Sequence, residues 1–385
     1  MSNRLAIVTT HPIQYYAPVF RLLAEKMPVK VFYTAGAGKK LDKGFGKNIE
    51  WDIPLLEGYD HQFLTNIATD QGTHHFKGII NTDAISSIKA YQPTAILVFG
   101  WSNHSHLKIL RHFKGKIPIY FRGDSTLLDQ KQNIKNVLRS IFLSWVYRHI
   151  DYAFYTGSAN RQYYLKYGVP EKKLIFAPHA IDVRRFAEDR NEAALAFRSS
   201  LGLSDSEILI LFAGKLEPKK NPMLLLCAFV EINLANVHLL FVGNGVLENE
   251  LKDHVKLQVP EILATKIHFS DFQNQSMMPV VYQAANLYCL PSKGPGETWG
   301  LAVNEAMAAG TAVLVSDKVG CSTDLVSTAV GAIFKSEDLA DLKQKLIILT
   351  QSKSDLIDKG KNAAKAIQDW SFERQVSAIL AYVNR

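Results

Sequence analysis

The sequence has few cysteines and no long apolar run. Its three cysteines, Cys227, Cys289 and Cys321, include no Cys-x-x-Cys pair. Neither a disulfide framework nor a zinc site of the usual spacing is therefore expected. No apolar stretch reaches the roughly 18 residues that a membrane-spanning helix needs. The chain runs directly from its first residues into an apolar segment, Leu5–Thr9, without the features of a signal peptide. These absences favour a cytoplasmic protein.

Several catalytic motifs are also missing. The chain has no Asp-x-Asp pair that would bind a metal–diphosphate complex, no P-loop and no Gly-x-Ser-x-Gly. Gly243 and Gly245 bracket Asn244 at the end of an apolar segment, but the third glycine of a dinucleotide fingerprint is absent. We therefore expect no metal, no nicotinamide and no other cofactor.

Positive charge is concentrated in the first half of the chain. The whole sequence has a net charge of +8, of which residues 1–185 carry +12 and residues 186–385 carry −4. A basic half indicates contact with an anionic partner, for which nucleic acid and anionic lipid are both candidates. A surface that serves only solubility is the alternative.

Short apolar segments alternate with amphipathic ones throughout the 385 residues. The expected strands are Leu5–Thr9, Val29–Tyr33, Ala95–Phe99, Pro118–Phe121, Tyr152–Tyr155, Ile208–Phe212, Val237–Val242, Ile267–Phe269, Leu287–Leu290 and Ala312–Val315. Alternating strands and helices predict an α/β fold with parallel sheets covered by helices on both faces. We expect two Rossmann-like domains, 1–185 and 186–370, joined near residues 182–192. Ligands in such sheets bind at the carboxyl ends of the strands.

The most informative segment is a glycine-rich loop between two apolar segments. Glu297 lies in this loop, followed by Thr298, and Glu305 lies in the helix that comes next. The backbone N–H groups of Trp299, Gly300 and Leu301 would form the start of that helix, where an anion is stabilised. A carboxylate accepts paired hydrogen bonds from vicinal hydroxyls. An anion site between two such carboxylates predicts a nucleotide sugar as ligand.

This segment resembles the Glu-x7-Glu donor motif of retaining GT-B glycosyltransferases of family 4, the glycosyl transferases group 1. Further segments that resemble the family are Phe212–Lys220, Leu240–Gly245, Ile267–Phe272 and Ala177–Asp182. The likeness covers most of the C-terminal half and only loosely the N-terminal half. It also implies that the last helix, Ser371–Asn384, crosses back to the first domain.

The resemblance implies roles for the residues that match the family pattern. Lys215 and Lys220, after the strand end at Gly214, would hold the pyrophosphate, although the family usually has arginine at 215. The backbone near Gly243, Phe272 and Gln273 would face the nucleoside. Glu297 would orient the sugar hydroxyls, and Glu305 would bind the ribose.

Polar residues of the first half extend this expected site. His11, Gln14 and Tyr15 follow the first strand, and His11 would contact donor phosphate or acceptor. Arg122 stands where relatives often carry a histidine and would place a guanidinium near the transferred group. His104 and His106 are better explained as hydrogen-bonded loop residues. The basic amphipathic stretch 131–149 is better explained as a core-packed helix than as a membrane-surface helix.

The expected function is that of a retaining, metal-independent hexosyltransferase. It would move a hexose from a nucleotide sugar, UDP-glucose or a similar donor, to a saccharide or lipid-linked saccharide in polysaccharide or cell-envelope synthesis. Its catalytic residues would be Glu297, Lys220, Lys215, Arg122 and His11. The protein would meet the inner membrane face peripherally and would have no nucleic-acid partner. The alternatives are a nucleotide-sugar epimerase of the same fold and a catalytically silent protein that binds nucleotide sugar.

Overall fold

The computed structural model describes residues 3–37, 41–42, 47–48, 50–130 and 134–384. The chain forms two compact units. Unit 1 comprises residues 1–39, 53–180 and 372–385, and unit 2 comprises residues 40–52 and 181–371. The division after residue 180 is close to the expected linker at 182–192. The inclusion of residues 40–52 in unit 2 was not foreseen from the sequence.

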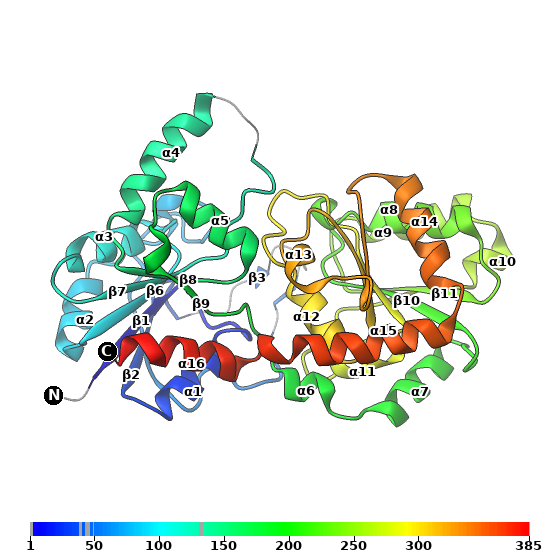
Figure 1. The fold of residues 1–385 in the computed structure, drawn as a ribbon, viewed down its shortest axis with the longest axis horizontal. Helices are drawn as coiled ribbons and strands as arrows, with labels where there is room; N and C mark the ends of the chain where they lie inside the picture. Colours follow the sequence, from blue (N-terminus) through cyan, green and yellow to red (C-terminus); the bar gives the residue numbers. More distant parts are fainter. Residues whose placement is uncertain (1–2, 38–40, 43–46, 49, 131–133, 385) are drawn as a thin grey trace. The chain divides into compact units, whose positions relative to one another are not determined.

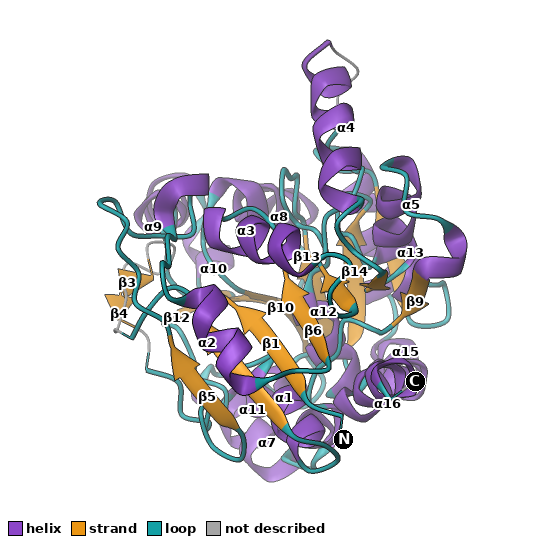
Figure 2. Ribbon diagram, turned by 90° about the vertical axis from the view of Figure 1, so that its left-hand side faces the viewer, coloured by secondary structure: helices purple, strands orange, loops and turns teal. Residues whose placement is uncertain are grey.

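Unit 1 is built on a seven-stranded parallel sheet with helices on both faces (Figures 1 and 2). The strands, in spatial order, are β5 (Asp60–Phe63), β2 (Val29–Tyr33), β1 (Leu5–Thr9), β6 (Ala95–Phe99), β7 (Ile119–Arg122), β8 (Tyr152–Tyr155) and β9 (Leu174–Phe176). The helices are α1 (Ala17–Ala24), α2 (Ala84–Tyr91), α3 (His104–Phe113), α4 (Ile134–Tyr147), α5 (Ser158–Lys166) and α16 (Phe372–Val383), with short 3₁₀ turns η1 (Phe76–Gly78) and η2 (Glu171–Lys173). The last helix, α16, packs on α1 within this unit.

Unit 2 repeats the architecture with a six-stranded parallel sheet. Its strands, in spatial order, are β12 (Ile267–Ser270), β11 (Val237–Val242), β10 (Ile208–Ala213), β13 (Leu287–Leu290), β14 (Ala312–Ser316) and β15 (Gly331–Phe334). Its helices are α6 (Val183–Ala187), α7 (Asn191–Ser200), α8 (Pro222–Ile232), α9 (Glu248–Gln258), α10 (Glu261–Ala264), α11 (Met278–Ala284), α12 (Leu301–Ala308), α13 (Ser322–Leu325), α14 (Leu339–Thr350) and α15 (Lys353–Ala366), with η3 (Pro218–Lys220) and η4 (Ile367–Trp370). A small antiparallel pair, β3 (Leu41–Asp42) and β4 (Lys47–Asn48), also belongs to unit 2.

The parallel sheets explain why the central strands are almost entirely apolar. Every residue of β1, β6, β10 and β11 is buried, because helices cover both faces of a parallel sheet. The predicted strands are confirmed with shifts of one residue at some ends. Strands β3, β4, β5, β9 and β15 were missed. β5 is largely polar, and the others have only two to four residues, too few for a clear periodic signal.

Helix α4 differs from the expectation that the stretch 131–149 is packed into the core. Residues 131–133 of that stretch lie outside the described residues. Leu143, Val146 and Tyr147 are buried against the unit, but Val137, Leu138, Ile141 and Phe142 are exposed by 42–67%. The periodicity indicated an amphipathic helix correctly, yet a period alone does not say how much of an apolar face a neighbour covers. Within the described ranges, no helix is both long and apolar enough to cross a membrane.

Candidate functional site

A buried ion pair lies at the carboxyl edge of the unit 2 sheet. Lys220 Nζ, in the loop after β10, is 2.5 Å from Glu297 Oε2, in the loop after β13. Ser292 Oγ donates to the same carboxylate oxygen at 3.1 Å. The side chain of Glu297 is 8% exposed and that of Lys220 is 17% exposed. Removing one partner from such a pair leaves an uncompensated charge in a low-dielectric environment.

The loop that carries Glu297 is fixed by its backbone. Gly320 N donates to Glu297 O at 3.0 Å and Cys321 N donates to Trp299 O at 2.9 Å. The carbonyl of Thr298 lies so close to Gly320 that a Cβ at position 320 would be 1.8 Å from it. The 297–300 segment is therefore held as a strand-like partner of residues 320–321.

Gly300 is the N-cap of α12 and has a backbone conformation that favours glycine. Its φ is +92°, and a Cβ there would lie 2.8 Å from Val319 Cγ1. Leu301 is the first helical residue, so the expected helix start at residues 299–301 is confirmed in position. The indole of Trp299 is buried and donates to Asn304 Oδ1 at 2.9 Å. This bond ties the loop to the first turn of α12.

The second carboxylate of the motif is also buried. Glu305 is 3% exposed, and Tyr282 of α11 donates its hydroxyl to Glu305 Oε2 at 3.0 Å. Burial, followed by the charges of Glu297 and Glu305, raises the pKa of Tyr288 in β13 well above its usual value. Both carboxylates thus contribute to one region of negative potential. Tyr282 was not identified from the sequence, because only the fold brings α11 beside α12.

The glycines after β10 and β11 serve a close approach of two backbones. A Cβ on Gly243 would lie 2.1 Å from the carbonyl oxygen of Gly214, and one on Gly245 would lie 2.4 Å from that of Leu216. The requirement for glycine at 243 is therefore explained by packing inside the protein. The same approach places the two loops side by side at the carboxyl edge.

Asn244, in the loop after β11, bonds to the loop after β12 and to the first residue of α9, and it was not identified from the sequence. Its Nδ2 donates to Asp271 Oδ1 at 2.8 Å and to Glu248 Oε2 at 3.0 Å. Its Oδ1 accepts from Phe272 N at 3.0 Å, so the Phe272 amide expected to face a base is bonded inside the protein. Gln273 Nε2 donates to Ser270 Oγ and Asp271 O. The sequence feature that could have indicated this role is an asparagine between two glycines at a strand end.

The three lysines of the β10–α8 segment have different surroundings. Lys219 pairs with Glu217 at 3.4 Å and is 40% exposed, so it points outward. Its carbonyl accepts from Lys293 N at 2.9 Å, which joins this loop to the Glu297 loop. Lys215 is half-buried between Gly214 and Leu216. Lys220 contacts the carboxylate of Glu297.

In unit 1, Arg122 is a buried residue that organises the backbone. It is 2% exposed, and its two terminal nitrogens donate to Ala177 O and Pro178 O, both at 2.9 Å. Burial lowers the pKa of Arg122. Burial and the charge of Arg122 lower the pKa of His179 well below its usual value. Two nitrogens of the guanidinium are thus bonded to the 177–178 carbonyls inside unit 1, and a role of Arg122 near a transferred group stays a prediction.

The histidines of unit 1 separate into structural and exposed groups. His106 is 1% exposed, with Nδ1 3.0 Å from the carbonyls of Phe99 and Gly100 and Nε2 2.9 Å from Thr34 Oγ1. The predicted hydrogen bonding of His106 is confirmed, but His106 lies in α3 and not in a loop. His104 stacks edge-on with Phe76 at 6.0 Å. His11 is exposed after β1, with Nδ1 2.9 Å from Thr10 Oγ1.

Among the described residues, one group of side chains has the ligand types and the proximity that a metal ion needs. Asp70, His74 and His75 place their ligand atoms within 4.8 Å of one another. Their spacing in the sequence is not that of a usual zinc motif, so the sequence did not predict this group.

The family model that matches this chain covers part of its second half. Residues 195–366 match the family model described as glycosyl transferases group 1. D-inositol 3-phosphate glycosyltransferase of Nocardia farcinica is 27% identical over 231 residues, which cover 58% of this chain and 50% of the relative. The enzyme of that name from Segniliparus rotundus is 34% identical over 164 residues, 40% of this chain and 34% of the relative. The chain spans about half the length of the curated relatives it matches, or less.

Solved structures share the fold over nearly the whole chain. Sucrose-phosphate synthase of Thermosynechococcus elongatus superposes with a TM-score of 0.73 at 18% identity, covering 99% of this chain and 98% of that one. Anabaena HepE in complex with UDP and glucose has a TM-score of 0.73 at 15% identity, covering 99% of both chains. At these identities the likeness establishes the fold.

Proposed function

We propose that this chain, which has the GT-B glycosyltransferase fold and a glycosyl transferases group 1 domain at residues 195–366, transfers a hexose from UDP-hexose to a saccharide or lipid-linked saccharide. The observation that carries the proposal is the buried Lys220–Glu297 pair. A cation and a carboxylate at the carboxyl edge of a parallel sheet are suited to a ligand that combines phosphate and sugar.

Each part of the donor has a candidate partner in unit 2. The diphosphate of the donor would take Lys220 and Lys215 as counter-charges, together with the N-terminus of α12. Glu297 would then accept from sugar hydroxyls, and Glu305 would accept from the ribose. The complexes of Anabaena HepE with UDP, with UDP and glucose, and with UDP-glucose support a uridine nucleotide sugar as donor.

The proposed reaction retains the anomeric configuration and uses no metal. The acceptor hydroxyl would attack from the face that the diphosphate leaves, and a departing phosphate oxygen would take its proton. The bond to the diphosphate breaks as the bond to the acceptor oxygen forms. Such a step depends on positioning and on stabilising the leaving group. Lys220 and Lys215 would supply that stabilisation, and His11 would contact the phosphate or the acceptor from unit 1.

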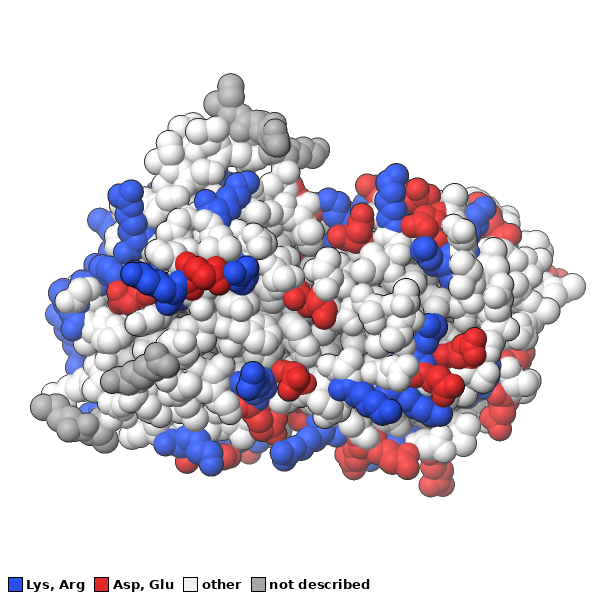
Figure 3. Space-filling view, viewed as in Figure 1, with Lys and Arg blue, Asp and Glu red and all other residues white. Residues whose placement is uncertain are grey.

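The acceptor would meet unit 1 beside an anionic membrane. Residues 130–150 contain four lysines or arginines and no acidic residue. The exposed face of α4 also carries four large apolar side chains, those of Val137, Leu138, Ile141 and Phe142. In Figure 3 the surface over α4 is mostly white, with blue side chains beside it. An apolar face with basic flanks is the pattern by which a helix lies in the interface of an anionic membrane.

Ligand-induced stabilisation tests the proposal directly. UDP and UDP-hexose, each at about 100 times its Kd, should stabilise the folded protein by about 2.7 kcal/mol. A thermal shift of several degrees is expected with UDP-hexose, followed by slow release of UDP that an acceptor accelerates. Absence of a shift with every UDP- and GDP-sugar would refute the proposal. Conversion of the donor to an epimeric UDP-sugar without acceptor would identify an epimerase, and binding without turnover a silent protein.

A further inference from the structure

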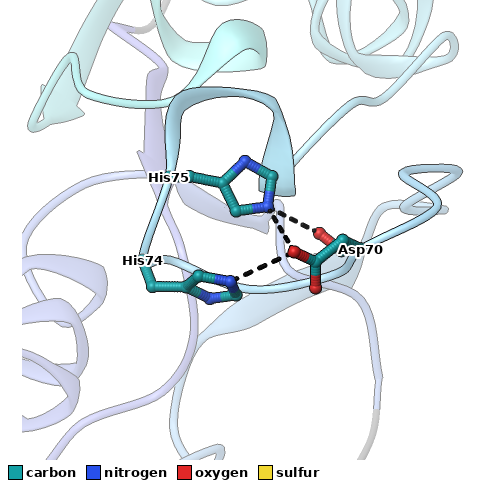
Figure 4. A group of neighbouring side chains, drawn as sticks. All are labelled: Asp70, His74 and His75. Atoms are coloured by element: carbon teal, nitrogen blue, oxygen red, sulfur yellow. Dashed lines mark hydrogen bonds and ion pairs between the residues drawn. The ribbon is translucent and has the colours of Figure 1, made fainter.

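A loop of unit 1 gathers two imidazoles around one carboxylate. His74 Nε2 lies 3.3 Å and His75 Nε2 lies 3.1 Å from Asp70 Oδ2. The two rings have centroids 4.6 Å apart and meet at 71°, so they do not stack. Figure 4 shows both rings directing a nitrogen toward the Asp70 side chain. The three groups come from one short segment, and their ligand atoms lie within 4.8 Å of one another. His75 Nε2 is also 3.0 Å from the backbone carbonyl oxygen of Asp70.

The separations of these atoms suit a bound ion. In a tetrahedral zinc site with bonds of about 2.0–2.1 Å, neighbouring ligand atoms are about 3.3–3.4 Å apart. The two nitrogen-to-oxygen separations of 3.1 and 3.3 Å are close to that value. Two imidazoles with one carboxylate favour zinc, cobalt or nickel over magnesium or calcium, which prefer oxygen ligands.

The loop is shaped mainly by contacts that do not involve the three side chains. Gly72 N donates to Gly78 O at 3.0 Å and Asn66 Nδ2 donates to the same oxygen at 3.0 Å. Gln71 Nε2 donates to Asn66 O at 2.8 Å. A Cβ at Gly72 would lie 2.4 Å from His74 Nδ1, so the ring rests on the Gly72 backbone. A loop closed in this way loses little conformational freedom when an ion binds.

The cluster is open to solvent and lies on the ligand-binding side of the sheet. The side chains of His74 and Asp70 are 50% and 71% exposed, so an ion can enter without rearrangement. The loop follows β5 at its carboxyl end, and Phe76, next to His75, contacts His104 at the start of α3. The carboxyl ends of parallel strands are where ligands bind in such sheets.

We propose that Asp70, His74 and His75 bind one divalent transition-metal ion of the zinc class, with a fourth position open to water or to an anionic group. The ion would hold the 70–76 loop at the carboxyl edge of unit 1. This site is independent of the proposed sugar transfer, since its ligands belong to unit 1 and the donor residues to unit 2.

Metal binding to the full chain tests the site. After treatment with EDTA and its removal, the protein is titrated with Zn²⁺ by calorimetry and with Co²⁺ by visible absorption, where tetrahedral cobalt absorbs intensely. One ion per chain is expected, with a rise in melting temperature. The variant His74→Ala/His75→Ala should bind that ion at least 10-fold more weakly. The matched control, His112→Ala/His254→Ala, removes two histidines elsewhere and should bind as the wild type does.

A second variant separates loss of ligands from loss of structure. Asp70→Asn keeps the size of the side chain and should also weaken binding while leaving the metal-free melting temperature within a degree or two. Equal binding by the wild type and both cluster variants would overturn the proposal, and so would the absence of a one-to-one cobalt spectrum. The latter result would mean that the cluster is held by hydrogen bonds alone. None of these measurements depends on a nucleotide sugar, so their failure is distinguishable from failure of the proposed function.

Discussion

At the scale of single residues, the two glutamates of the donor motif differ in what surrounds them. Glu297 is bonded to a cation and a hydroxyl, whereas Glu305 is bonded to the phenol of Tyr282. Hydrogen bonds that involve a charged group contribute about 1.5–3 kcal/mol. The different partners allow the proposed sugar and ribose roles to be separated by mutation.

Glu305→Ala should weaken binding of both UDP and UDP-hexose by about 10- to 100-fold, which corresponds to the loss of such hydrogen bonds. Glu297→Ala should change UDP affinity little and should reduce turnover or intact-donor affinity. Calorimetry with both ligands measures these affinities. The control Tyr282→Phe keeps Glu305 and removes only the hydroxyl that donates to it. Equal losses of UDP affinity in the two glutamate variants would refute the assignment.

Lys220 and Lys219 form a natural comparison, since they are adjacent but differently paired. Lys220→Ala should lower the turnover number by about 100-fold or more, as expected for removal of a group that stabilises developing charge. Lys219→Ala removes an equal charge from an exposed pair with Glu217 and should stay within about 2-fold of wild type. Steady-state kinetics with saturating UDP-hexose measure the turnover number of each variant. Similar losses in both variants would indicate a general charge effect.

At the scale of elements, helix α12 has a glycine with positive φ at each end. Gly300 has φ +92° and close neighbours around the position that a Cβ would take, whereas Gly310 has φ +79° and open space at that position. Alanine at either residue incurs backbone strain of about 1 kcal/mol. Only at position 300 would the added Cβ also clash with Val319, at 2.8 Å, and it would lie 3.7 Å from Glu297 Oε1.

Gly300→Ala should therefore lower the free energy of unfolding by about 2–4 kcal/mol and impair donor binding. Gly310→Ala should cost about 1 kcal/mol and leave donor binding unchanged. Urea unfolding and UDP calorimetry on both variants measure the two effects. If the variants were equally stable, the crowding at Gly300 would be relieved by movement of Val319.

Helix α4 is an element whose apolar face is exposed, and its role is tested with vesicles. Leu138→Ser/Ile141→Ser should abolish most flotation with anionic vesicles, because two large apolar side chains no longer enter the interface. Ile262→Ser, which changes an 82% exposed isoleucine of α10, is the control and should float as wild type does. Binding should also weaken with salt, since exposed charges are screened beyond about 10 Å at 0.1 M. Failure of wild type to bind anionic vesicles at low salt would leave a free saccharide as the acceptor.

At the scale of the whole molecule, the proposed reaction places the donor in unit 2 and assigns the leaving group to lysines. EDTA should therefore leave at least half of the transfer rate intact, even when it empties the Asp70 site of unit 1. Rate measurements with and without EDTA, then with added Mg²⁺ or Mn²⁺, provide the check. Abolition by EDTA with rescue by either ion would contradict metal-independent transfer.

The sequence by itself determined the two parallel sheets, since uninterrupted apolar strands that alternate with helices have few other ways to bury both faces. It also located the loop of Glu297 and the helix start at Leu301, because glycine positions and helix periodicity are local signals. Lys220 was singled out because its segment, Phe212–Lys220, resembles the family pattern.

The tertiary structure alone decided which side chains meet. Tyr282 lies beside Glu305, Asn244 joins its loop to the loop after β12 and to α9, and Arg122 donates to the 177–178 carbonyls. The exposed face of α4 and the proximity of Asp70 to His74 and His75 were likewise decided by the tertiary structure. Each depends on the distance between residues of different elements or on the path of one loop. Local propensity and spacing fix the elements, whereas packing fixes their neighbours and with them the direction of every polar side chain.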